Sequence, residues 1–244
     1  MDLLQERADV NLMMLGITYP GPGIVIGLSE DGKTLIQVCW IMGQDDNGQN
    51  RVFVKNADGD LHTAAADPSE VTDHSPIVYR AMAEEGSLFV VTNGAQTESI
   101  IRSLRSFGGA LGEYQYKPDD PNFTPRISAQ IILKTGGTYS VQMSVLRRSP
   151  FDDECERSLF SFESLPPGFG HLISTYSGDG DPLPPFTGGP LLLPVIGDTA
   201  EQIGAFFRDN LVPDNFVSLA VKTIDVITGE SLIHIINRHR QVGT

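Results

Sequence analysis

Short runs of apolar and β-branched residues, separated by turns rich in glycine, proline and asparagine, dominate the chain. Runs of this kind are typical of β-strands. Helical patterns are fewer: a short helix ending near residue 14, one after residue 93 and one after residue 198. The pattern predicts strands over residues 24–28, 34–42, 52–54, 77–82, 88–91, 127–133, 139–146, 216–226 and 232–236, and two more between residues 158 and 198.

Tight turns connect several of these strands and predict hairpins. Ser-Glu-Asp-Gly joins 24–28 to 34–42, Gly136 and Gly137 join 127–133 to 139–146, and Thr-Gly joins the last two strands. The first two strands are almost continuously apolar, which favours a sheet covered on both faces. Between residues 54 and 77 we expect a loop with a break at Asp-Pro.

Residues 88–104 predict a buried strand that runs through an Asn-Gly turn into a helix. Asn93 is the expected N-cap, and Gly108 with Gly109 the expected end of this helix. Free N–H groups at such a turn favour an anion, although the same turn also serves as a simple connection. For the later helix we expect Asp198 as the N-cap, with Glu201 three residues on.

Many strands with two or three helices predict an α+β fold in one domain, residues 1–244, built as two sheets face to face with helices outside. Exposed strand edges in such a fold are compatible with a homo-oligomer.

The charge of the chain limits its partners. A formal net charge of −14 argues against nucleic acid and against anionic membranes as partners, because both require a basic surface. No apolar run is long enough to span a bilayer, and the first ten residues lack the pattern of a signal peptide. With only two cysteines, Cys39 and Cys155, the composition favours a cytoplasmic protein without disulfides.

Neither a metal site nor a nucleophile stands out. The five histidines lack metal-binding spacing, and the acidic loop around Asp179 lacks the register of a calcium loop, so we expect no metal. There is no G-x-S-x-G motif, Asp2 follows Met1, and burial in an apolar strand should raise the pKa of Cys39.

Arginines at strand ends are the remaining chemical candidates: Arg51, Arg126, Arg147 and Arg148. Arginine suits a bidentate contact with phosphate or a carbonyl oxygen, but each could equally pair with an acidic residue at the surface. Tyr79, in the strand predicted over 77–82, is either a core ring or a proton donor.

Four segments, "YPGPGIVIG", "NRVFV", "IVYRAMAEEGSLFVVTNGAQTESI" and "DDPNFTPRISAQI", together resemble the archaeal-type inosine monophosphate cyclohydrolases and their bacterial relatives over about the first 150 residues. The resemblance implies a four-layer αββα sandwich like that of N-terminal nucleophile hydrolases, without autoprocessing. It also implies a hydrolase of purine biosynthesis that needs no cofactor. Such an enzyme closes the purine ring of formylated aminoimidazole carboxamide ribotide, a small-molecule nucleotide, with loss of water.

The resemblance implies catalytic roles for Arg51, Tyr79 and Arg126: either arginine steadies the oxyanion, and Tyr79 relays a proton. It implies that the substrate-binding residues are Asn50, Asn93, Gly94, Thr97 and Thr124.

The chain also departs from the archaeal pattern. It carries Gln96 where that pattern has histidine, and Asp45 and Asp46 in a segment that is more basic there. A non-catalytic purine-nucleotide-binding module is therefore the alternative function. An amide hydrolase on the same fold is a further alternative, but this chain offers no suitable nucleophile for it. The role of the loop over residues 178–185 is open.

Overall fold

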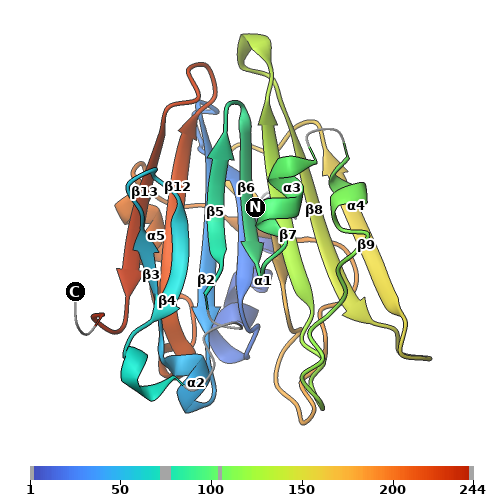
Figure 1. Cartoon of the computed structure of the whole chain (residues 1–244). Coiled ribbons are helices and arrows are strands. Elements are labelled where there is room, and N and C mark those ends of the chain that lie inside the picture. The colour runs from blue at the N-terminus through green and yellow to red at the C-terminus, as the bar shows by residue number, and fades with distance from the viewer. Residues whose placement is uncertain (1–2, 72–77, 104–105, 242–244) are drawn as a thin grey trace.

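The computed structural model describes residues 3–71, 78–103 and 106–241 of the 244-residue chain, and these residues form two antiparallel sheets (Figure 1). The first sheet has the strand order β11 (Leu191–Pro194), β10 (Phe169–Ser174), β1 (Gly23–Leu28), β2 (Thr34–Met42), β12 (Phe216–Asp225) and β13 (Ser231–Asn237). The second has the order β3 (Arg51–Lys55), β4 (Leu61–Ala65), β5 (Arg80–Glu85), β6 (Leu88–Asn93), β7 (Arg126–Leu133), β8 (Tyr139–Arg148) and β9 (Cys155–Phe162).

Apolar side chains of the two sheets face each other and form a shared core. Ile26 and Cys39 of the first sheet pack in one cluster with Phe89 and Met143 of the second. Burial raises the pKa of the Cys39 thiol, as expected from the sequence. Helices cover part of the opposite faces of both sheets, whereas edge strands such as β9 keep exposed residues there.

The helices lie on the outer faces of the sandwich (Figure 1). Helices α1 (Leu3–Ile17) and α5 (Ala200–Asp209) cover the first sheet, where Trp40 stacks on Phe207. Helices α3 (Thr97–Arg102) and α4 (Phe107–Ala110) cover the second sheet and enclose a small cluster that contains Val90. The described residues thus confirm a mixed α and β sandwich of two sheets with outer helices. Likeness to N-terminal nucleophile hydrolases stays a prediction.

Short helical segments lie in the connections. Helix α2 spans Asp46–Gln49, and 3₁₀ turns span Pro68–Glu70, Thr135–Gly137 and Pro213–Asn215. No helix of residues 3–71, 78–103 and 106–241 is long and apolar enough to cross a membrane.

The strand pattern was predicted well, with three differences. Strand β4 was missed, because its His and Ala residues carry a weak β signal although they alternate between buried and half-buried. The strand predicted over 77–82 is β5, which begins at Arg80; Tyr79 lies just before it, and residue 77 lies outside the described residues. Between residues 155 and 194 there are three strands, β9, β10 and β11, where two were expected.

Both predicted helix caps were wrong. Helix α3 has Gln96 as its N-cap, because the side-chain oxygen of Asn93 instead accepts a hydrogen bond from the Tyr79 hydroxyl. In α5 the cap is Thr199, whose hydroxyl accepts from the Gln202 N–H. Asp198 lies one residue earlier, where its own N–H donates to the Gln202 side chain.

The end of α3 was also placed wrongly. The helix ends at Arg102. Gly108 and Gly109 lie inside α4, which begins after Ser106 because the Ser106 hydroxyl accepts from the Gly109 N–H.

An ion pair joins the two sheets inside the sandwich. Lys222 of β12 is fully buried, and its ammonium donates to Glu84 of β5 at 2.7 Å, where Ser231 also donates. Burial by itself raises the pKa of Glu84, but the hydrogen bonds from Lys222 and Ser231 outweigh it and lower the pKa overall. Glu84 therefore contributes stability above its unfolded pKa, and this contribution is lost as the pH falls through the lower folded pKa.

We expect Glu84→Ala to destabilise the fold by about 3 kcal/mol at pH 7, because it leaves a buried ammonium unpaired; Glu84 is partly exposed, which places the loss at the low end for a buried pair. Urea unfolding measures the loss, which should shrink at acid pH. Glu85 is exposed, so Glu85→Ala is the matched control and should lower the free energy of unfolding by less than about 0.5 kcal/mol. Equal effects of the two variants would contradict a role for the ion pair.

Candidate functional site

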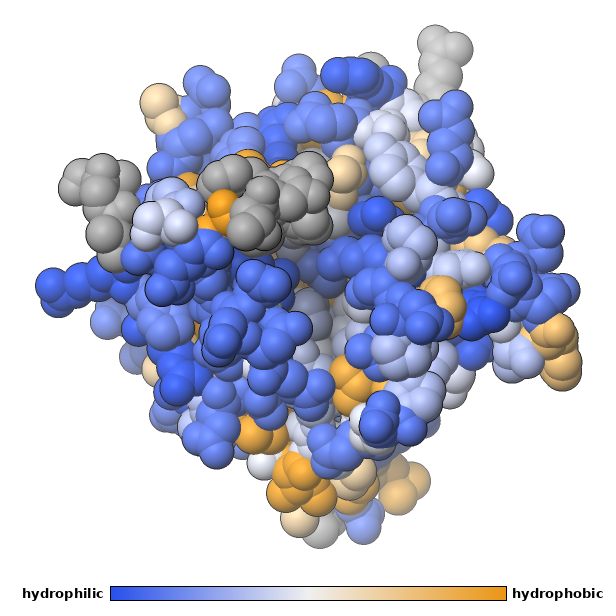
Figure 2. All heavy atoms as spheres, turned by 60° about the horizontal axis from the view of Figure 1, so that its bottom comes forward, coloured by the Kyte–Doolittle hydropathy of each residue, from blue (hydrophilic) through white to orange (hydrophobic). Residues whose placement is uncertain are grey.

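The topology of the second sheet gathers cations at one end of the molecule. The sheet runs in chain order from β3 to β9 with every neighbour antiparallel, so β3, β5 and β7 all start at the same end. Arg51 and Arg126 are the first residues of β3 and β7, and Tyr79 precedes β5. This end is the lower one in Figure 1, near α2. Hydrophilic residues cover most of the surface there, with single apolar residues between them (Figure 2).

A cavity of about 360 Å³ opens at this end, and we call it the basic pocket. Its volume falls within the usual range of small-molecule sites. It brings together three of the residues that the sequence indicated, Tyr79, Gly94 and Arg126. The full lining is Tyr79, Gly94, Ala95, Lys117, Pro118, Asp119 and Arg126.

Tyr79 is held in place as a hydrogen-bond donor. Its ring is buried, and its hydroxyl donates to the side-chain oxygen of Asn93 at 2.5 Å. Burial raises the pKa of the Tyr79 hydroxyl well above its ordinary value, and the nearby guanidinium of Arg51 only partly opposes this. The hydroxyl therefore keeps its proton at neutral pH.

Arg126 reaches the pocket from the start of β7. Its Nε donates to the Gln115 carbonyl oxygen at 2.9 Å, which fixes the plane of the guanidinium. Desolvation lowers the pKa of Arg126, although an arginine keeps its charge in proteins. None of the ion pairs between described residues involves Arg126, so its outer nitrogens are available for an anion.

Arg51 lies near the pocket without lining it. Its guanidinium donates to the carbonyl oxygens of Gly48 at 3.0 Å and Met42 at 3.3 Å. Its charge nevertheless acts on the pocket, because it lowers the pKa of both Tyr79 and Lys117. Arg51 thus adds positive potential to the pocket without lining it.

Gly94 shapes the wall beside Arg126. Its φ of +139° is unfavourable for other residues. A Cβ at this position would lie 2.5 Å from Nη1 of Arg126 and 2.4 Å from the side-chain oxygen of Gln96. Gln96 is fully buried and donates to the Ile127 carbonyl oxygen and to the Ser128 hydroxyl, both at 3.1 Å. Gln96 thus braces the turn against β7.

Lys117 and Asp119 were not singled out from the sequence. They lie in the proline-rich loop that precedes β7, where a lysine beside two aspartates was the available signal. Both oxygens of Asp119 are engaged by Thr124, one by its N–H and the other by its hydroxyl, each at 2.6 Å. The Thr124 carbonyl oxygen in turn accepts the Lys117 N–H at 2.9 Å.

Thr124 therefore supports the loop whose residues Lys117 and Asp119 line the pocket. Since its hydroxyl proton goes to the Asp119 carboxylate, the Tyr176 hydroxyl must donate to the Thr124 oxygen, 2.6 Å away. Mainly because of burial, the pKa of Tyr176 is raised to about 12, so this hydroxyl remains protonated. The structure places Thr124 as a brace of the loop that carries Lys117.

Two other predicted binding residues lie outside the basic pocket. Thr97 is buried and does not line the pocket, and its hydroxyl donates to the Arg80 carbonyl oxygen at 2.5 Å. Asn50 uses its whole side-chain amide on the backbone of Asp67, donating to the carbonyl oxygen at 2.9 Å and accepting from the N–H at 2.7 Å. Their direct contact with a ligand stays a prediction.

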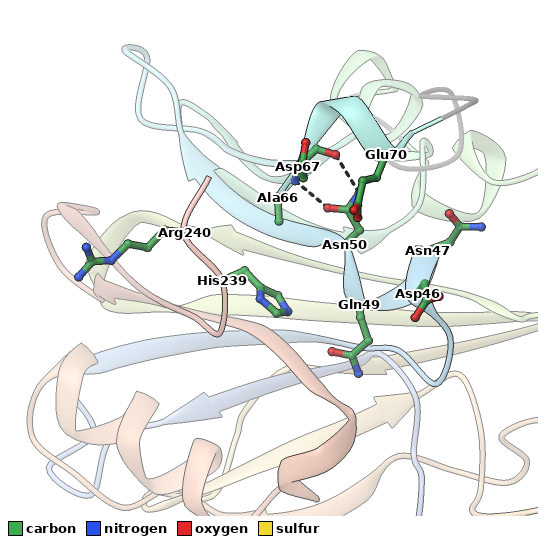
Figure 3. A pocket seen from close by; sticks show the side chains of 9 residues that line it. All are labelled: Asp46, Asn47, Gln49, Asn50, Ala66, Asp67, Glu70, His239 and Arg240. Carbon is green, nitrogen blue, oxygen red and sulfur yellow. Dashed lines mark hydrogen bonds between the residues drawn. The ribbon is translucent and has the colours of Figure 1, made fainter. Parts of the chain in front are cut away.

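Asn50 lines a second, larger hollow of about 680 Å³, which we call the acidic hollow (Figure 3). Three carboxylates line it, against one arginine and one histidine, so it offers a weaker attraction to phosphate than the basic pocket does. Its lining consists of Asp46, Asn47, Gln49, Asn50, Ala66, Asp67, Glu70, His239 and Arg240.

The remaining candidates have structural partners. Arg147 pairs with Glu156, and Arg148 pairs with Asp153. Asp179 accepts a hydrogen bond from the Tyr19 N–H at 3.0 Å. Among the residues that the structure describes, no group of three or more His, Cys, Asp or Glu side chains is placed to hold a metal ion.

The chain thus combines a two-sheet sandwich with a small cation-lined pocket at one end of its sheets, an arrangement typical of a small-molecule site. The sequence model of the family described as IMP cyclohydrolase-like protein matches residues 19–230, and the chain belongs to this family. The match extends well beyond the 150 residues that carry the resemblance in the sequence. No curated protein matches the chain.

We expect Gly94→Ala to displace the Arg126 guanidinium, because the new Cβ overlaps Nη1. Backbone strain should add about 1 to 3 kcal/mol of destabilisation. Urea unfolding measures the loss, and the NMR resonance of the Arg126 Nε–H reports the displacement.

Gly86→Ala is the control, since Gly86 also has a positive φ, +59°, but has open space around it. A Gly94→Ala protein with an unshifted Arg126 resonance would show that the glycine is not needed for the pocket.

Proposed function

We propose that the protein is an inosine monophosphate cyclohydrolase. The reaction closes the purine ring of formylated aminoimidazole carboxamide ribotide: the carboxamide nitrogen attacks the formyl carbon, and water is lost. Family membership supports a function related to this reaction. The pocket supports the particular chemistry.

Ring closure is intramolecular, so a pocket that holds the two reacting groups together supplies much of the rate. Correct positioning of reacting groups is worth on the order of 7 kcal/mol or more. The remaining need is to stabilise negative charge on the formyl oxygen and to move protons. The walls of the pocket can position the reacting groups, and its fixed cations can stabilise the negative charge.

The observation that carries the proposal is the convergence of separate segments on the basic pocket. Tyr79, Gly94 and Arg126 come from three different strand ends and line one cavity with Lys117. Positive charge is concentrated there in a chain of net charge −14. A ribotide with its phosphate is an anion of a suitable kind for such a pocket.

The free guanidinium nitrogens of Arg126 suit the oxyanion, and Arg51 strengthens the positive potential. Tyr79, protonated and fixed by Asn93, suits a hydrogen bond to the reacting groups. We propose Gly94 and the Asn93 turn as the wall against which the base lies.

Arg126→Ala should lower turnover of formylated ribotide by about 10² to 10³-fold, the effect of removing one donor to an oxyanion. Formation of the hypoxanthine chromophore in ultraviolet absorbance measures the rate. The melting temperature should stay near that of the unmodified protein, since Arg126 is only half-buried and makes one hydrogen bond.

Arg102→Ala, an exposed arginine at the end of α3, is the matched control and should leave turnover unchanged. A joint loss of activity and of thermal stability in Arg126→Ala would assign Arg126 a structural role instead.

One observation favours a second candidate, a non-catalytic module that binds purine nucleotides. Gln96 cannot exchange protons as a histidine does, and its amide is used to brace the turn. Isothermal calorimetry with inosine monophosphate separates the two functions. Binding without any turnover of formylated ribotide would favour the module.

A further inference from the structure

Lys117 lines the basic pocket, but neither the sequence motifs nor the reaction described above gives it a role. Its side chain is half-buried and lines the cavity beside Tyr79 and Arg126. No hydrogen bond or ion pair joins its ammonium to another described residue. Backbone contacts with Thr124 hold its loop in place, so the lysine is positioned without being neutralised.

The charged groups around Lys117 come from three parts of the chain. Arg51 of β3 and Arg126 of β7 repel its ammonium, whereas Asp119 of the same loop attracts it. The carboxylate of Asp119 is already shared between the N–H and the hydroxyl of Thr124, which weakens its hold on the lysine. The net effect favours loss of a proton.

The other polar groups of the pocket are poor proton carriers. An arginine does not release its proton in proteins. The raised pKa of the buried Tyr79 hydroxyl leaves it protonated, and its proton is directed to Asn93. Both Asp119 oxygens accept hydrogen bonds from Thr124.

Lys117, by contrast, can both release and accept a proton near neutral pH. Desolvation, with repulsion from Arg51 and Arg126 in support, lowers the pKa of its ammonium to about 8. A group with a pKa near the working pH both gives and takes protons readily, which is what general acid and base catalysis requires.

We propose that Lys117 is the proton-transfer residue of this pocket, acting on the formyl oxygen and on the ring nitrogens during closure. The inference rests on the proposed cyclohydrolase function. It assigns a catalytic role to a residue outside the set that the family resemblance indicated.

Four proton transfers, two in each half of the reaction, account for the ring closure. As the carboxamide nitrogen bonds to the formyl carbon and the C=O π bond breaks, the Lys117 ammonium protonates the oxygen, and the neutral amine then takes a proton from the attacking nitrogen. In the second half, the ammonium protonates the hydroxyl as the C–O bond breaks and water leaves. The former formamide nitrogen forms the C=N bond and returns its proton to Lys117, so the lysine ends as it began.

Substitution by arginine tests the role directly, because Lys117→Arg keeps the positive charge but cannot exchange protons. We expect kcat to fall by about 10² to 10⁴-fold, with a small change in KM and in melting temperature. Lys33→Arg, on an exposed lysine, is the matched control and should keep full activity.

The pH profile and chemical rescue give readouts that a structural role would not move. In the unmodified protein, kcat/KM should fall as the pH rises above about 8, where the ammonium deprotonates. This limb should be absent from the residual activity of Lys117→Arg. In Lys117→Ala, added ethylamine should restore activity in proportion to its concentration.

The possible failures are distinguishable. An active unmodified protein with an equally active Lys117→Arg variant would overturn the role of Lys117 and leave the cyclohydrolase function standing. An unmodified protein that binds inosine monophosphate but never turns over formylated ribotide would overturn both. If Lys117→Arg unfolds, the amine rescue and pH profile of Lys117→Ala decide; absence of rescue would reject the proposal.

Discussion

The packing of the two sheets against each other is the constraint on which the site depends. The apolar faces of both sheets are buried in one core, and the fully antiparallel order of the second sheet fixes the direction of each strand. Odd-numbered strands of that sheet therefore begin at a common end, which brings Arg51, Tyr79 and Arg126 together although 75 positions separate the first from the last. Burial of ordinary apolar residues thus creates the charged pocket.

Concentrating positive charge in this way is electrostatically unfavourable, and the described residues do not neutralise the charge with ion pairs. Burial, together with repulsion from Arg51 and Arg126, lowers the pKa of the Lys117 ammonium, and the Asp119 carboxylate, which opposes this shift, is engaged by Thr124. Elsewhere in the described residues, arginines such as Arg147 and Arg148 have carboxylate partners. A pocket whose cations lack such partners is stabilised by an anionic ligand, which relieves the repulsion.

Much of the fold could be predicted from the sequence because strand signals are local. Hydrophobic runs and Gly-containing turns identified the hairpins of β1 with β2 and of β7 with β8. Caps were harder, since Asn93, Thr199 and their neighbours compete for the same backbone groups and tertiary contacts decide between them. The site was partly predictable: Tyr79, Gly94 and Arg126 line one pocket, while Asn50 and Thr97 are used inside the framework. Lys117 escaped notice because desolvation, which gives it its chemical interest, arises only after folding.

In our proposal the basic pocket, and not the larger acidic hollow, holds the nucleotide. A crystal structure of the protein with inosine monophosphate tests this claim most directly. We predict that the nucleotide lies among Tyr79, Lys117 and Arg126, in the cavity of about 360 Å³. Electron density for the nucleotide beside Asn50, Asp67 and His239, with the basic pocket holding only water, would contradict it.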